Sequence, residues 1–147
     1  MRPISMSIFM AISMLFTGCG VKQDQEKEKA AAEAVATNLF ATIQLGDFDS
    51  AMTFYSSSFF QETSKDEWKA MLRKLQNNLG TLKNYELVTL DVKKNSYTSG
   101  SGIYWVLQYI VTYSKYLARE TITVFKLDDG QFKIHGHNIK STVLLKE

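Results

Sequence analysis

The sequence predicts an α+β domain in which three N-terminal helices pack on a curved four-stranded antiparallel sheet, preceded by a cleaved signal peptide. Three observations lead to this prediction. An uncharged apolar run opens the chain, apolar residues then recur every three or four positions, and the second half alternates apolar with polar residues. Helices followed by strands are typical of domains whose helices cover one face of an antiparallel sheet.

The N-terminus begins with a positive charge and an apolar run, which lead to two small residues and a cysteine. Arg2 is followed by the 13 uncharged residues Ile4–Phe16, a length that suits a signal peptide and falls short of the ~20 residues that span a bilayer. The segment Leu15-Phe16-Thr17-Gly18-Cys19 is similar to the lipobox of bacterial lipoproteins, in which small residues precede a cysteine. The resemblance implies cleavage after residue 18 and acylation of Cys19, and two or more acyl chains give stable anchoring.

These features predict three segments: a signal peptide over 1–18, the lipidated Cys19 with a short polar tether over 19–29, and one domain over 30–147. The lipoprotein resemblance places the protein in the cell envelope. Gly20 follows the cysteine where an aspartate resembles an inner-membrane retention signal, so the outer membrane, on its periplasmic side, is favoured if the organism is Gram-negative.

Composition excludes several classes of function. The formal net charge of +2 and the mixing of lysines with acidic residues argue against nucleic-acid binding. Cys19 is the only cysteine, so an internal disulfide and a cysteine-based zinc site are excluded. We expect neither a cofactor nor a bound metal.

The helices are predicted from apolar spacing and capping residues. The first runs from Gln25 to Leu45 and ends at Gly46, after which Asp47 caps a second helix over 48–59. Ser64 and Glu67 form a capping box that opens a third helix, which ends at Gly80.

Four strands are predicted for the second half. The first, over 85–93, places Val88, Leu90 and Val92 on one face. A loop over 95–102 follows, and the strand over 103–113 then carries a heavily aromatic face. The third strand covers 118–127, Asp128-Asp129-Gly130 forms a hairpin turn, and the last strand covers 131–144. The aromatic face comprises Ile103, Trp105, Leu107, Tyr109, Val111 and Tyr113.

The order of elements looks like the nuclear transport factor 2-like (cystatin-like) cone. Within that order, a series of caps, turns and core positions occurs: Gly46-Asp47-Phe48, Ala51, Phe54, Ser58, Phe59, Trp68, Leu79-Gly80, Glu86-Leu87, Tyr109, Glu120-Thr121, Asp129-Gly130-Gln131-Phe132-Lys133-Ile134, Gly136 and Ile139. With this series, residues 30–140 are similar to a bacterial envelope family known as domain of unknown function 4019, which carries no agreed activity. Phe132 stands where such domains often carry tryptophan.

Two sets of side chains are candidates for chemistry. His135 and His137 share a face at i,i+2 unless Gly136 marks a bulge, which would send them to opposite faces. No third ligand can be assigned to them, so a metal site is not expected. Asp91 and Glu120 are the strand carboxylates available for acid–base catalysis in a cone. The residues expected to line a cone pocket, or else to fill the core, are Trp105, Tyr109, Tyr113, Phe125, Phe132 and His137.

No catalytic motif stands out, so the leading hypothesis is a non-enzymatic module, tethered to the membrane through Cys19, that binds an unidentified envelope protein with a sheet face or the cone mouth. The alternative is a binder of a small apolar ligand in the cone pocket. A lyase or isomerase using Asp91 and Glu120 is a weaker third hypothesis. Fold analogy also admits a homodimer paired through the sheet.

Overall fold

The computed structural model describes residues 20–95 and 102–141. The expected signal peptide, Cys19, most of the expected 95–102 loop and the end of the last predicted strand lie outside these residues. The described elements are α1 (Gly20–Gln44), α2 (Phe48–Ala51), the 3-10 helix η1 (Met52–Phe54), α3 (Phe59–Glu62), α4 (Lys65–Leu79), β1 (Leu82–Asn95), β2 (Gly102–Tyr113), β3 (Leu117–Lys126) and β4 (Phe132–Lys140).

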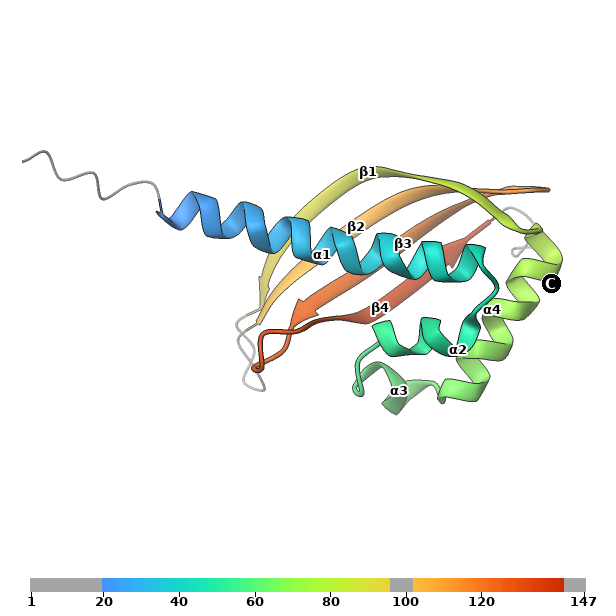
Figure 1. Ribbon diagram of the computed structural model, residues 1–147, viewed down its shortest axis with the longest axis horizontal. Helices are drawn as coiled ribbons and strands as arrows, with labels where there is room; N and C mark the ends of the chain where they lie inside the picture. The colour runs from blue at the N-terminus through green and yellow to red at the C-terminus, as the bar shows by residue number, and fades with distance from the viewer. Residues whose placement is uncertain (1–19, 96–101, 142–147) are drawn as a thin grey trace, which may run out of the picture.

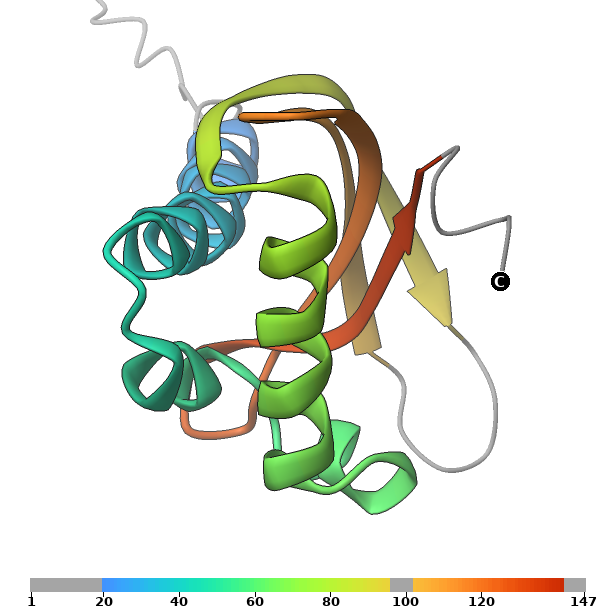
Figure 2. The same cartoon turned by 90° about the vertical axis from the view of Figure 1, so that its right-hand side faces the viewer.

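The strands form one antiparallel sheet in the order β1-β2-β3-β4, and the helices lie on one side of it (Figures 1 and 2). α1 runs lengthwise along the sheet. Its N-terminal half lies at the end where β1 and β3 finish and β2 and β4 begin (Figure 1). The predicted α+β architecture is therefore confirmed. We call the helix-covered side the inner face and the opposite side the outer face.

α1 buries the predicted apolar stripe. Ala32, Ala36, Leu39 and Phe40 have no solvent exposure, because their three- and four-residue spacing brings them to one side of the helix. The helix begins at Gly20, earlier than expected, so the segment predicted to be a polar tether is helical over residues 20–29. A helix rises only ~1.5 Å per residue, which makes this connection much shorter than an extended tether.

The single helix predicted over 48–59 is wrong. Asp47 caps α2 as expected, its Oδ1 accepting a bond from the Ser50 N–H at 3.0 Å. After η1, however, Tyr55 is extended, with φ −87° and ψ 149°, and bridges to Ile134 of β4. The Ser56 hydroxyl accepts a bond from a nearby backbone N–H, an alternative that competes with helix. The bridge to β4 further stabilises the extended conformation at Tyr55, and helical spacing in the sequence cannot reveal it. The predicted helix is therefore broken, and the described residues contain four α-helices instead of three.

α4 confirms the predicted capping box. The Glu67 N–H donates to the Ser64 hydroxyl at 3.3 Å, and the Ser64 N–H donates to the Glu67 carboxylate at 3.0 Å. The helix buries its apolar stripe and ends at Gly80, which has a φ of 90°. The buried residues are Trp68, Leu72, Leu75 and Leu79.

β1 contains a bulge that changes the predicted pattern. The pairing with β2 shifts register between Leu87 and Thr89, so Val88 has no partner on β2. Leu90 and Val92 pair with inner-face residues of β2, as expected, but Val88 is 57% exposed and is not part of that face.

β2 and β3 follow the predicted alternation, and their buried side chains point toward the helices. Trp105, Leu107, Tyr109, Val111 and Tyr113 are buried from β2. The hairpin turn after β3 is confirmed by the 2.9 Å bond from the Gly130 N–H to the Leu127 carbonyl and by a φ of 86° at Gly130. β3 contributes Ala118, Glu120, Ile122 and Val124 to the buried side.

Candidate functional site

The interior of the fold contains four polar side chains joined by hydrogen bonds, which we call the Glu120 network. Glu120 projects from β3 and is 1% exposed. The Tyr113 hydroxyl donates to its Oε1 at 2.6 Å. His137 Nε2 lies 2.8 Å from its Oε2, and the Tyr55 hydroxyl lies 2.8 Å from His137 Nδ1. The network joins three strands to the segment that follows η1.

A bulge in β4 brings His137 into this network. The pairing with β3 shifts register between Thr123 and Val124, and His135 is the residue left without a partner. The two histidines therefore lie on opposite faces, as expected if a bulge occurs at Gly136. The His137 side chain is fully buried, whereas His135 is exposed and its ring contacts Phe125 on the outer face.

The surroundings keep the tyrosines of the network protonated. Burial raises the pKa of Tyr55, and burial together with the charge of Glu120 raises the pKa of Tyr113. A consistent proton arrangement has Tyr55 donating to Nδ1 of His137 and Nε2–H of His137 donating to Glu120. Both carboxylate oxygens then hold a donor, and the network is closed on itself.

The residues expected to line one cone pocket do not share one. Tyr109 and Tyr113 are buried in the packed core. Phe132 packs against Trp105, with their ring centroids 5.2 Å apart. Phe125 is a correction: it lies on the outer face with Tyr104, because the inner face of β3 is formed by the even-numbered residues. The prediction counted it without regard to that parity.

Asp91 is also corrected. It pairs with Val106, an outer-face position of β2, and is exposed, so it cannot join Glu120 in the interior. The bulge at Val88 does not turn Asp91 toward the interior. After the bulge the register is regular, with Leu90 and Val92 on the inner face and Asp91 between them on the outer face.

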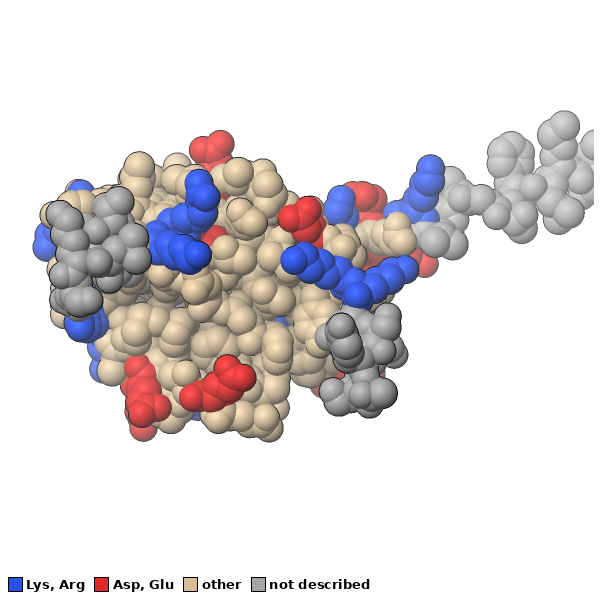
Figure 3. Space-filling view, turned by 180° about the vertical axis from the view of Figure 1, so that it is seen from behind, with Lys and Arg blue, Asp and Glu red and all other residues tan. Residues whose placement is uncertain are grey.

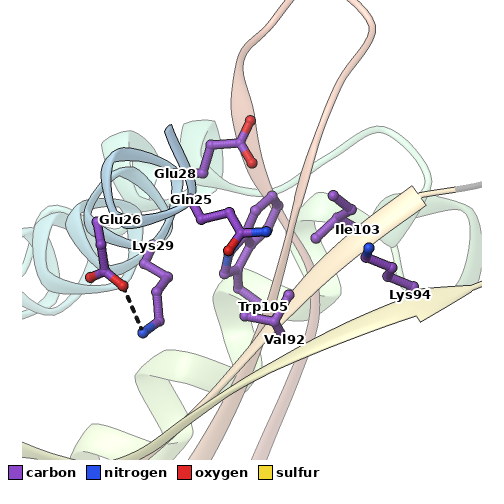
Figure 4. Close-up of a pocket in the computed structure, with 8 residues that line it drawn as sticks. All are labelled: Gln25, Glu26, Glu28, Lys29, Val92, Lys94, Ile103 and Trp105. Atoms are coloured by element: carbon purple, nitrogen blue, oxygen red, sulfur yellow. Dashed lines mark ion pairs between the residues drawn. The ribbon is translucent and has the colours of Figure 1, made fainter. Parts of the chain in front are cut away.

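Trp105 forms the floor of a cavity of about 370 Å³ between α1, β1 and β2, which we call the α1 cavity (Figure 4). Gln25 extends over the indole ring, and Val92 and Ile103 lie beside it (Figure 4). The full lining comprises Gln25, Glu26, Glu28, Lys29, Val92, Lys94, Ile103 and Trp105.

A second groove, of about 340 Å³, lies between α4 and β4. Trp68, Met71 and Ile139 supply apolar walls, and His137 lines part of it. The indole Nε1 of Trp68 is buried without a hydrogen-bond partner among the described residues. The groove therefore borders the Glu120 network, but no polar atom of that network is left free toward it.

The outer face carries an uncharged area over the two central strands, which we call the outer strip. Tyr104 and Phe125 stack at one end of it, with ring centroids 6.1 Å apart. Figure 3 views this side of the molecule and shows a broad uncharged surface between groups of charged side chains. The outer strip comprises Tyr104, Val106, Gln108, Ile110 and Thr112 of β2 and Thr121, Thr123 and Phe125 of β3, all half-buried.

Sequence reasoning found part of the network and missed the rest. Glu120 and His137 were candidates because both occur in strands. Tyr55 was missed because it was assigned to a helix. Trp68, which lines the groove beside the network, was taken as a core residue because of its spacing. One signal was available. Ala118, Glu120 and Ile122 are two residues apart, so period two places the Glu120 carboxylate on the same face as two apolar side chains, the buried face.

Across residues 20–95 and 102–141, no three histidine, cysteine or acidic side chains are grouped to hold a metal ion. None of the helices in these ranges is long and apolar enough to cross a bilayer.

Comparison with solved structures identifies the fold. A protein from Catenulispora acidiphila superposes with a TM-score of 0.57 at 9% identity, covering 81% of this chain and 94% of its own. A protein described as a putative scytalone dehydratase from Novosphingobium aromaticivorans DSM 12444 superposes with a TM-score of 0.54 at 14% identity, covering 82% of this chain and 88% of its own. These likenesses agree with the nuclear transport factor 2-like fold. No curated protein sequence matches the chain.

The family model described as "Protein of unknown function (DUF4019)" matches residues 35–137, from the middle of α1 to His137 in β4. This match covers most of the chain and agrees with the resemblance seen in the caps, turns and core positions. The chain therefore belongs to the DUF4019 family, with a nuclear transport factor 2-like α+β domain.

Proposed function

We propose that this protein is a bacterial lipoprotein, held to the cell envelope by acyl chains on Cys19, that acts without catalysis by binding an envelope protein. The observation that supports binding is the outer strip, eight uncharged side chains on adjacent strands with no helix over them among the described residues. Contiguous exposed surface of low charge is typical of protein interaction sites.

The closed Glu120 network supports a non-catalytic role. A general acid or base must come within hydrogen-bond reach of the proton it transfers. Both oxygens of Glu120 are already occupied by Tyr113 and His137, and its side chain is 1% exposed. The likeness to a putative scytalone dehydratase, at 14% identity, extends to the fold and carries no activity to this chain.

The signal sequence supports the proposed location. An apolar run, two small residues and a cysteine precede α1, and Gly20 at the next position favours the outer membrane, facing the periplasm, in a Gram-negative cell. Mass spectrometry of the protein made in its native host tests this anchoring. We expect residues 1–18 to be absent and Cys19 to carry diacylglyceryl and acyl groups. A bare thiol or a retained leader contradicts it.

Partner binding is tested by site-specific photo-crosslinking in the native host. A photoreactive residue at Thr121, on the outer strip, should give an adduct with a different protein. The substitution Ile110→Arg, diagonal to Thr121 and in register with Arg119, adds a second like charge to that end of the outer strip and should abolish the adduct. The matched control is Asn38→Arg, an exposed position on α1 away from the sheet, which should leave the adduct intact.

Two outcomes contradict the proposal. An adduct of twice the monomer mass would identify a homodimer in place of a different partner. Equal adduct yields from wild type and Ile110→Arg would show that the outer strip does not form the interface.

A further inference from the structure

We infer that the α1 cavity holds one phospholipid of the membrane that carries the protein, with an acyl chain against Trp105 and the phosphate near Lys94. The inference rests on the proposed anchoring at Cys19. It concerns a different surface from the outer strip, because the cavity lies between α1 and the inner face of the sheet (Figure 4).

The position of the cavity follows from where α1 begins. Helix starts at Gly20, the residue directly after Cys19, and Gln25 lies over the cavity floor. Five residues of helix advance roughly 7.5 Å. The headgroup layer of one leaflet is roughly 5–8 Å thick, taking half the difference between the whole bilayer and its hydrocarbon core. When Cys19 is anchored, the end of the cavity at Gln25 therefore lies at the headgroup layer, and the whole cavity lies there when α1 is tilted toward the membrane plane.

The floor of the cavity, Trp105, is buried, and the apolar side chains beside it are open to solvent. Val92 and Ile103 are 49% and 37% exposed, so the cavity has apolar surface that a hydrocarbon chain could cover. An apolar patch with a polar rim is typical of a ligand or membrane contact. The volume of about 370 Å³ lies at the lower end of the range, ~300–1,000 Å³, of small-ligand sites. A hydrocarbon chain at this depth would cover both side chains.

The charges at the rim fit a phosphate. Glu26 pairs with Lys29 at 3.5 Å, and Glu28 pairs with Lys126 at 2.9 Å. Among the described residues no salt bridge involves Lys94, so the charge left unpaired at the cavity rim is positive. A lysine ammonium binds phosphate as a point charge, and their attraction becomes stronger when water is excluded.

The test compares two valines of β1. Val92→Glu places a carboxylate in the cavity, whereas Val88→Glu makes the same change at the bulge, where the side chain is slightly more exposed and does not line the cavity. Full-length lipidated protein is purified in mild detergent, and its bound phospholipid is measured by native mass spectrometry. We expect one phospholipid per chain for wild type and Val88→Glu, and at least tenfold less for Val92→Glu.

A second readout uses fluorescence. The chain has two tryptophans, so Trp68→Phe leaves Trp105 alone and Trp105→Phe leaves Trp68 alone. In vesicles of phosphatidylglycerol and phosphatidylethanolamine with spin-labelled acyl chains, we expect quenching of Trp105 to exceed that of Trp68 severalfold. Adding Val92→Glu to Trp68→Phe should remove this excess.

The outcomes separate this inference from the proposed anchoring. Protein with acylated Cys19 that carries no phospholipid, or the same amount in the Val92→Glu variant, overturns the inference and leaves the anchoring intact. A bare Cys19 overturns both.

Discussion

Nε2 of His137 lies 2.8 Å from Oε2 of Glu120, and both side chains are almost completely removed from solvent. Removing one partner of such a pair leaves the other buried without compensation, which is far costlier than never having had the pair. Two tyrosines complete the network: Tyr113 of β2 bonds to Glu120, and Tyr55, from the segment after η1, bonds to His137. The Glu120 network thus fixes how the helical layer sits over the sheet.

Replacing Glu120 should separate charge from hydrogen bonding. Glu120→Ala leaves the Tyr113 hydroxyl and the His137 N–H as buried donors without an acceptor and opens a cavity. We expect a loss of about 3–5 kcal/mol in the free energy of unfolding. Glu120→Gln should lose only about 1–2 kcal/mol, because the amide can accept from Tyr113 and, after a tautomer change in His137, donate to Nε2.

Urea denaturation followed by circular dichroism measures both values. Equal losses from the two variants would show that the hydrogen bonds of Glu120 do not govern its contribution.

The two histidines provide a matched pair created by the bulge. His137→Ala removes a buried ring that bonds to Glu120 and Tyr55, so we expect a loss of about 3–4 kcal/mol. His135→Ala removes an exposed ring that bonds to Ser58 and packs on Phe125, so we expect about 1 kcal/mol or less. Thermal denaturation ranks them. A ranking in the opposite order would contradict the assignment of His137 to the interior.

Alkaline pH should destabilise the fold through its buried tyrosines. The folded state holds the pKa of Tyr55 and Tyr113 above the ordinary value of 10.0, so above that pH the unfolded chain loses protons that the folded chain keeps. The unfolded state then binds fewer protons, and the free energy of unfolding falls as pH rises. Each tyrosine contributes about 1.4 kcal/mol per pH unit.

The check is a series of urea denaturations between pH 8 and pH 11. Wild-type stability should be steady below about pH 9.5 and fall above pH 10, and Tyr113→Phe should fall less steeply by about 1.4 kcal/mol per unit. A flat profile up to pH 11 in wild type would contradict the protonated state of both hydroxyls.

Local signals predicted most of the fold. The capping box of Ser64 and Glu67, the turn at Gly130 and the alternation around Trp105 each depend on neighbouring residues, and the structure confirms all three. The break at Tyr55 could not be predicted, because it depends on pairing with Ile134, 79 positions away in the chain. Distant backbone partners leave no periodic trace.

The candidate site shows the same division. Period two is enough to place Glu120 on the buried face, but the bulges at Val88 and His135 reset the period within a strand. Those two bulges decide that Val88 points away from the inner face and that His137 meets Glu120. Phe125 was assigned to the inner face by mistake. Val124 is on the inner face, and successive residues of a strand point to opposite faces, so Phe125 lies on the outer face.

Gly80 and Gly130 provide the last matched pair, because both have positive φ, of 90° and 86°. A Cβ at Gly130 meets nothing within 4 Å, so Gly130→Ala adds only backbone strain and should cost about 1–2 kcal/mol. A Cβ at Gly80 collides with the Ser114 hydroxyl and approaches the Lys115 backbone at 3.1 Å. That hydroxyl accepts a bond from the Thr81 N–H, so moving it leaves a donor unpaired. Gly80→Ala should therefore cost about 3–4 kcal/mol, the strain plus the lost bond and the clash. Urea denaturation of both variants decides the matter, since equal losses would mean that the contact between the end of α4 and the β2–β3 turn yields without cost.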